Sequence, residues 1–168
     1  MLNQKVGLGG VFTVECVDVD GKVKWSEAFH NLVVNTGLQY INSQVFSAVT
    51  YTATWYMGLI NTGATYDAGD TMASHGTWTE NVGYVQSARP TMTFGSATTA
   101  DPSVIVSGVV AFTMNASGTI AGAFLTTDNT KSGTTGTLFS EGNFTVGDRP
   151  VVIGDTINVT YTFSADAV

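Results

Sequence analysis

Hydrophobic and polar residues alternate over several stretches of the chain, which is the pattern of β-strands with one buried face. The clearest stretch lies near the C-terminal end, where Ile157, Val159, Tyr161 and Phe163 alternate with polar residues. Successive side chains of a strand point to opposite sides of its sheet, so these apolar side chains share one face. We predict a strand here that buries this face in the core.

A hairpin is predicted near the N-terminus. Residues 11–19 alternate for most of their length, and Asp20-Gly21 follows them. Asp-Gly between two such segments is a strong signal for a tight turn between antiparallel strands. Residues 22–25 form the expected return strand.

Further strands are predicted along the chain, with turn-forming residues recurring about every 8 to 15 residues. They cover residues 54–60, 90–95, 104–114, 119–127 and 137–146, and the turn at 115–118 is expected to join two of them as a second hairpin. The total of about eight to nine strands, without alternating helices, favours an all-β fold over a parallel α/β fold. We expect an antiparallel β-sandwich of the jelly-roll type.

One short helix is predicted over residues 36–47, with Asn35 or Thr36 as its cap. The apolar residues that indicate it fall at helical spacing: Leu38, Ile41, Val45 and Phe46. We expect this helix to close one end of the sandwich.

The length of 168 residues matches one domain with a sizeable core. Residues 1–10 contain the run Gly7-Leu8-Gly9-Gly10 and are interpreted as an N-terminal arm, which leaves residues 11–168 as a single sandwich domain. The first residues lack the basic start and apolar stretch of a signal peptide, so synthesis in a cytoplasm is expected. No apolar run approaches the about 20 residues of a membrane helix, so no membrane partner is expected.

Charge narrows the range of partners. Charged residues make up 11% of the chain, against about 25% in a typical domain, and the net charge is -7. The few Lys and Arg residues are scattered, which argues against nucleic acid as a partner. Low charge suits a surface that is covered by neighbouring protein chains, because the cores of interfaces are depleted of charge.

Catalytic chemistry is not predicted. The single cysteine, Cys16, lies within an apparent strand and is interpreted as a packed thiol. His30 and His75 are the only histidines, and neither belongs to a nucleophile motif such as G-x-S-x-G. We therefore expect a protein that is not an enzyme and has no catalytic residues and no cofactor.

The long polar segment 61–81 is the main candidate for a special role. Asp67, Asp70, His75 and Glu80 crowd it, and oxygen-rich loops can hold calcium, but their spacing matches no EF-hand. We expect solvated acidic residues here and no metal.

Aromatic residues in and near this segment indicate a possible contact surface. Trp78 and Tyr84 are expected to anchor the segment against the domain or against a partner, and together with Arg89 they are the candidate partner-contact residues. The alternative is a platform for sugar stacking built from Trp25, Trp55, Tyr56 and Trp78.

Several stretches of the first half also carry a resemblance. They are residues 25–27 (WSE), 31–38 (NLVVNTGL), 55–60 (WYMGLI), 70–75 (DTMASH), 78–80 (WTE), 89–90 (RP) and 93–95 (TFG). Over about residues 11–95 the chain resembles small structural proteins of tailed bacteriophages that are encoded among the head genes, some of which look like capsid cement or decoration proteins with jelly-roll folds.

The resemblance implies a structural protein of the virion. It would bind the outside of the phage capsid, with the major capsid protein as its partner, and stabilise the shell by bridging neighbouring subunits. A homo-oligomer, either a dimer or a trimer, is expected. The alternative is a tail-associated module that binds a receptor or a carbohydrate, since fold alone does not decide function.

Overall fold

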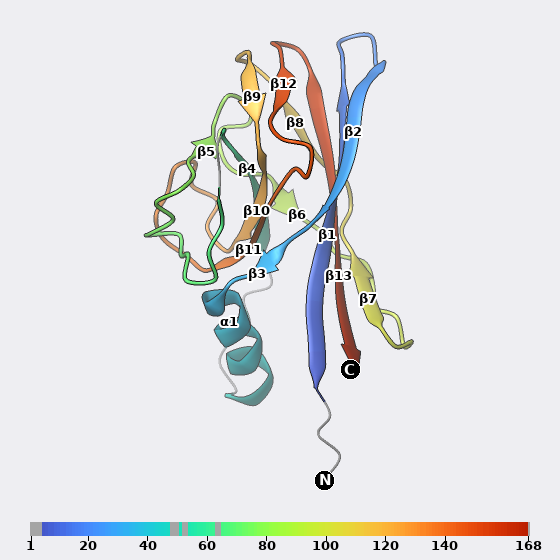
Figure 1. Cartoon of the computed structure of the whole chain (residues 1–168), viewed down its shortest axis with the longest axis vertical. Coiled ribbons are helices and arrows are strands. Elements are labelled where there is room, and N and C mark those ends of the chain that lie inside the picture. The colour runs from blue at the N-terminus through green and yellow to red at the C-terminus, as the bar shows by residue number, and fades with distance from the viewer. Residues whose placement is uncertain (1–4, 48–50, 52–53, 63–64, 168) are drawn as a thin grey trace.

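A computed structural model describes residues 5–47, 51, 54–62 and 65–167 of the chain. Its architecture is mostly strand with one helix, arranged as antiparallel sheets (Figure 1). The predicted all-β antiparallel sandwich is therefore confirmed. The strand order does not establish a jelly roll, so that part stays a prediction.

The first sheet has five strands around the two longest strands of the chain. Its members are β1 (Val6–Val17), β2 (Val23–His30), β7 (Ser103–Val106), β8 (Val110–Thr113) and β13 (Thr156–Ala167). β1 lies between β2 and β13, and both β7 and β8 pair with the far edge of β13. The predicted hairpin is confirmed: β1 and β2 are antiparallel, and Gly21 in their turn has a φ of +78°, which suits glycine.

The second sheet has six strands, and the helix packs against one of them, β11. Its strands are β3 (Leu32–Val33), β4 (Trp55–Ile60), β5 (Glu80–Asn81), β6 (Thr91–Met92), β10 (Gly122–Thr126) and β11 (Leu138–Asn143). A separate pair, β9 (Gly118–Ile120) with β12 (Arg149–Val151), lies at the end of the molecule away from the helix (Figure 1).

The predicted second hairpin around residues 115–118 is wrong. β8 pairs with β13 in the first sheet, whereas β10 lies between β4 and β11 in the second. Residues 104–114 are also interrupted between β7 and β8. The turn at 115–118 carries the chain from one sheet to the other, and the apolar pattern of a strand does not specify which strand it pairs with.

The core lies between the two sheets. Phe12, Val14 and Val159 from the first sheet share one buried cluster with Met57 and Leu125 from the second. The predicted face of the last strand is confirmed for Ile157, Val159 and Tyr161, each at most 1% exposed. Phe163 continues this face but is only partly buried, although its ring contacts Phe139 of β11.

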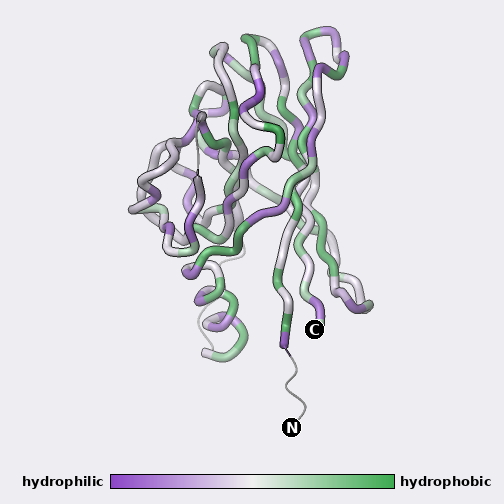
Figure 2. Tube along the Cα trace, viewed as in Figure 1, coloured by the Kyte–Doolittle hydropathy of each residue, from purple (hydrophilic) through white to green (hydrophobic). Residues whose placement is uncertain are grey.

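The second sheet is also buried on its other face. Ile60, Phe124 and Leu138 form a second cluster with Met72 and Trp78, which come from the long segment before β5. That segment is largely polar (Figure 2), yet it covers the sheet. The ring of Phe124 occupies the space above Gly58, its partner in the ladder, where any side chain at position 58 would collide with it.

The helix α1 (Asn35–Phe46) matches the predicted position, but its details differ. Neither Asn35 nor Thr36 caps it by a side chain: Val34 is the N-cap residue, and the Thr36 hydroxyl donates to the Leu138 carbonyl. Its predicted apolar face is not wholly buried, because Phe46 is 82% exposed. No described helix has the length and apolarity needed to span a bilayer.

The expected N-terminal arm is shorter than residues 1–10. From Val6 to Gly10 the chain is already part of β1 and pairs with β13. Residues 1–4 lie outside the described residues. β1 and β13 run on together past the second sheet, towards the end where both termini lie (Figure 1).

The last strand allows a test of the register. Replacing Tyr161, which is 1% exposed, with Asp should abolish folding, because an unpaired buried charge costs several kcal/mol. Thr160→Asp is the matched control, since Thr160 points to the other side of the same strand and is only partly buried. Soluble expression and thermal melting measure both; equal melting temperatures for the two variants would contradict the register.

Candidate functional site

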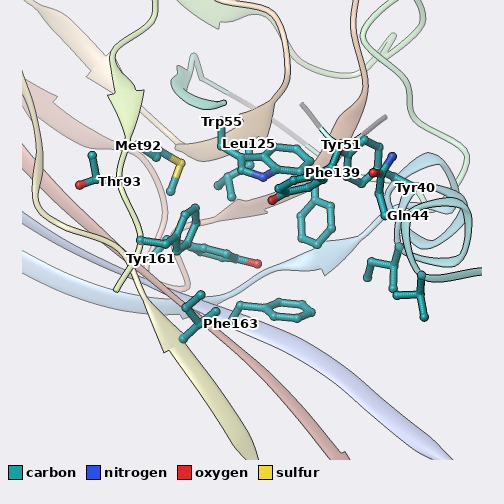
Figure 3. Close-up of a pocket in the computed structure, with 14 residues that line it drawn as sticks. Tyr40, Gln44, Tyr51, Trp55, Met92, Thr93, Leu125, Phe139, Tyr161 and Phe163 are labelled. Carbon is teal, nitrogen blue, oxygen red and sulfur yellow. The ribbon is translucent and has the colours of Figure 1, made fainter. Parts of the chain in front are cut away.

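An apolar groove opens at the end of the sandwich that holds the helix. Its volume is about 610 Å³. The lining residues come from α1, from both sheets and from the segments next to them: Tyr40, Ile41, Gln44, Val45, Tyr51, Trp55, Met92, Thr93, Phe94, Ile105, Leu125, Phe139, Tyr161 and Phe163. Figure 3 shows Phe163 and Tyr161 on one side of the space, with Trp55 and Phe139 on the other.

Aromatic rings build the wall of the groove. Tyr40 meets Trp55 edge-on with ring centroids 5.1 Å apart, and Trp55 meets Phe139 in the same way at 5.2 Å. Phe139 then contacts Phe163 across the groove at 5.6 Å. Edge-to-face contacts of this kind hold rings in fixed positions. The wall is therefore a preformed surface.

The chemistry of the groove is apolar. None of its described lining residues carries a charge, and its polar atoms belong to hydroxyl and amide groups. Its rim adds exposed apolar side chains, with Val45 65% and Tyr51 57% exposed, and Phe46 follows Val45 at the end of α1. Concave apolar surfaces with a few polar groups are typical binding sites. This groove suits apolar side chains of a partner.

The predicted partner-contact residues lie elsewhere and are buried. Trp78 is 4% exposed, Tyr84 1% and Arg89 2%. The Trp78 indole donates to Glu141 Oε2 at 2.7 Å, and the Tyr84 ring packs edge-on against Phe112. These side chains therefore pack inside the domain, and the prediction that they contact a partner at the surface is wrong.

Arg89 forms a buried ion pair that ties its own loop to β5 and to the loop between β10 and β11. Its guanidinium donates to both Glu80 carboxylate oxygens at 2.9 Å, and also to the carbonyls of Asp128 and Gly133. The Ser132 N–H donates to the same carboxylate. Bidentate pairs of this geometry fix orientation as well as charge. This cluster is a structural joint of the fold.

The acidic residues of the 61–81 segment do not converge. Glu80 faces Arg89, while His75 stacks on the Trp78 ring at a centroid distance of 3.8 Å. Asp67 and Asp70 form a turn, in which the Asp67 N–H donates to Asp70. Among the described residues no group of three or more His, Cys, Asp or Glu side chains could hold a metal ion.

Glu141 is a buried residue whose carboxyl group lies beside that of Asp70. It is 0% exposed, and burial followed by its hydrogen bond to the Asp70 side chain raises its pKa to about 8. Oε2 accepts from Trp78, whereas no hydrogen bond of good geometry reaches Oε1 from the described groups. A proton on Glu141 satisfies this oxygen by allowing it to donate to Asp70. The pair attaches the 65–79 segment to the sheet.

Cys16 is a packed strand thiol, as its sequence position predicts. It is 0% exposed, and its Sγ donates to Asp155 at 3.7 Å. Burial, together with the nearby Asp155 charge, raises the pKa of the thiol to about 12. A thiol of this kind is a poor nucleophile near neutral pH.

Sequence reasoning missed the groove. Its residues are spread from α1 to β13, and each is an ordinary apolar residue of a helix or strand. One signal was present in the sequence: the apolar positions of α1 continue to Val45 and Phe46 at its C-terminal end. In the structure both of these side chains are exposed.

Comparison with known proteins found no matching family model, no matching curated protein and no matching solved structure.

The Glu141–Asp70 pair predicts a pH dependence of stability. Between about pH 4.5, the ordinary pKa of the group, and about pH 8, folded Glu141 keeps a proton that the unfolded chain has lost. The free energy of unfolding therefore falls as pH rises through this window, by at most about 1.4 kcal/mol per pH unit for one proton. Glu141→Gln should remove this component.

Urea unfolding at several pH values measures the effect, with Asp20→Asn in the exposed β1–β2 turn as the control. An unchanged slope in Glu141→Gln would show that Glu141 is not the group that titrates.

The Arg89–Glu80 pair predicts a large loss of stability on truncation. Arg89→Met leaves the Glu80 carboxylate, which is 4% exposed, without its cation, and should cost about 3 to 5 kcal/mol. The matched variant is Arg149→Met. Its partner Glu27 is also buried but keeps hydrogen bonds from the Thr145 N–H, the Thr145 hydroxyl and the Val146 N–H, so this variant should cost less. Equal unfolding free energies for the two variants would count against a structural joint at Arg89.

Proposed function

We propose that this chain is a non-enzymatic structural protein of a tailed-phage virion, which binds the outside of the capsid and bridges neighbouring capsid subunits. The observation that carries the proposal is the apolar, charge-free groove with exposed apolar side chains on its rim. The resemblance of residues 11–95 to phage head proteins directs it to the capsid, and the major capsid protein is the proposed partner.

The groove is suited to bind apolar side chains of the capsid protein. A partner segment with apolar side chains would contact the rings of Trp55, Phe139 and Phe163, and its burial would release water from both surfaces. Well-packed aromatic pockets are where most of the binding energy of an interface resides. The groove and its apolar rim would act as the anchor, and the polar surface beyond them would surround the contact.

Stabilisation of a shell needs only modest affinity for each copy. Every bound copy resists separation of the subunits beneath it, and many copies act together on one particle. A rigid sandwich is suited to this role, because little ordering free energy is lost when it binds.

The alternative is a tail-associated receptor- or carbohydrate-binding module. Its sugar platform included Trp78, which is buried beneath His75 and bound to Glu141. The copy number in the virion distinguishes the two functions: a capsid protein is present in many copies on the head, and a receptor binder in few copies at the tail.

The rim of the groove provides the test. Val45→Ser removes an apolar side chain that lines the groove and is 65% exposed, so it should leave the melting temperature nearly unchanged and weaken binding to particles lacking the protein by about tenfold or more. Val19→Ser, 75% exposed in the turn at the opposite end, is the control and should bind normally. Binding is measured by co-sedimentation with the particles, and copies per head by gel densitometry. Full binding by Val45→Ser, or a handful of copies at the tail, would overturn the proposal.

A further inference from the structure

The first half of β1 leaves one of its edges open. β13 pairs with β1 from Val6 to Val17, but β2 reaches back only as far as Val11. Beyond that point the Asn31 N–H donates to the Gly10 carbonyl at 3.0 Å. No other described segment pairs with this edge from Val6 to Gly9.

The direction of the backbone groups follows from that one hydrogen bond. The Gly10 carbonyl points to the open side, and peptide groups of a strand alternate, so the N–H and C=O groups of Leu8 and Val6 point there too. Natural proteins protect such edges with charged residues, proline or bulges. The segment Val6–Gly10 has none of these: it is uncharged, lacks proline and pairs with β13 without a break.

We propose that this edge pairs antiparallel with the same edge of a second copy, so that one continuous sheet crosses the two-fold axis of a dimer. The axis passes beside Gly7, which faces Gly7 of the second copy. Val6 then faces Leu8 of the second copy, and these residues exchange their N–H and C=O groups. The inference stands on β1 itself and does not depend on the proposed function.

Side-chain direction selects this register. Facing residues of two antiparallel strands point to the same side of the sheet, so an even-numbered residue must face an even-numbered one. A two-fold axis beside Leu8 would place Val6 opposite Gly10, whose carbonyl is already occupied by Asn31. An axis beside Gly7 uses only the groups that are open.

The dimer explains why position 9 is a glycine. In the monomer a side chain at this position would meet nothing within 4 Å, so the packing of the chain does not require glycine there. Glycine inside a strand weakens it and often marks the close approach of another chain. In the proposed register Gly9 faces Lys5 of the second copy, which needs this space to cross the strand.

Charge complementarity favours a second copy as the partner. The Asp166 carboxylate lies over Gly7, its partner in the ladder, on the same side of the sheet as Lys5 and Gly9. It forms no ion pair with any described residue. Lys5 of the second copy starts opposite Gly9 and has the length, about 6 Å from Cα to Nζ, to approach Asp166 across the glycines.

The other side of the new sheet is apolar. Even-numbered residues of β1 face the core side, as Phe12 and Val14 show by their burial. Val6, which is 69% exposed, would lie beside Leu8 of the second copy on that side. Pairing therefore buries apolar area on one side and joins opposite charges on the other.

The test is the oligomeric state of the full chain, measured by sedimentation equilibrium over a range of concentrations. Wild type should be a dimer. Val6→Pro removes an N–H that points to the open edge at the first residue of the strand, so it should keep the wild-type melting temperature in dilute solution and weaken dimerisation about tenfold or more. A wild-type monomer at all concentrations, or a Val6→Pro dimer of wild-type affinity, would overturn the inference.

Charge reversal tests the register. Lys5→Asp and Asp166→Lys should each weaken the dimer by about two- to fivefold, and the double variant should restore it. Lys22→Asp, in the exposed β1–β2 turn, is the control and should leave the dimer unchanged. Failure of the double variant to recover would overturn the Gly7-centred register.

The same variants separate this inference from the proposed function. If Val6→Pro is monomeric and still binds particles, dimerisation is confirmed and is not needed for capsid binding. If wild type dimerises through β1 and binds no particle, the inference holds while the proposed function fails.

Discussion

The second sheet is buried on both faces, and most of the structure follows from that constraint. Strands β4, β10 and β11 present apolar side chains to the first sheet on one side and to the 65–79 segment on the other. Every peptide and polar group placed between these layers needs a partner, because an unpaired buried polar group costs free energy. The segment that covers the outer face must therefore supply both apolar anchors and hydrogen bonds.

This constraint explains why the most strongly perturbed groups of the chain are structural. Perturbed pKa values often mark catalytic sites. Here Glu141 projects from the sheet and holds the segment that covers it through Trp78 and Asp70. Asp155 works in the same way at the other end: burial would raise its pKa, but hydrogen bonds from Lys24 and the Val152 N–H lower it. Each of these carboxyl groups links two segments that are distant in sequence.

The two ends of the sandwich differ as a result. One end is closed by β9, β12 and the ion pairs of Asp155 and Glu27. At the other end β1 and β13 outrun the second sheet, and α1 stands apart from them across the groove (Figure 1). The apolar groove arises from this mismatch in sheet length. The open edge of β1 lies at the same end because β2 pairs with β1 only as far as Val11.

The sequence by itself determined the local elements. Alternation identified β13 and the second half of β1, and a mostly apolar stretch identified β4. Asp20-Gly21 identified the first hairpin, and helical spacing identified α1 within one residue. These signals depend on near neighbours in the chain. Only the tertiary structure decided which strands pair, that Trp78, Tyr84 and Arg89 are buried, and that Phe163 borders a groove. The physical reason is that burial of an aromatic or charged side chain depends on what the fold places above it, and here the covering residues come from distant parts of the chain.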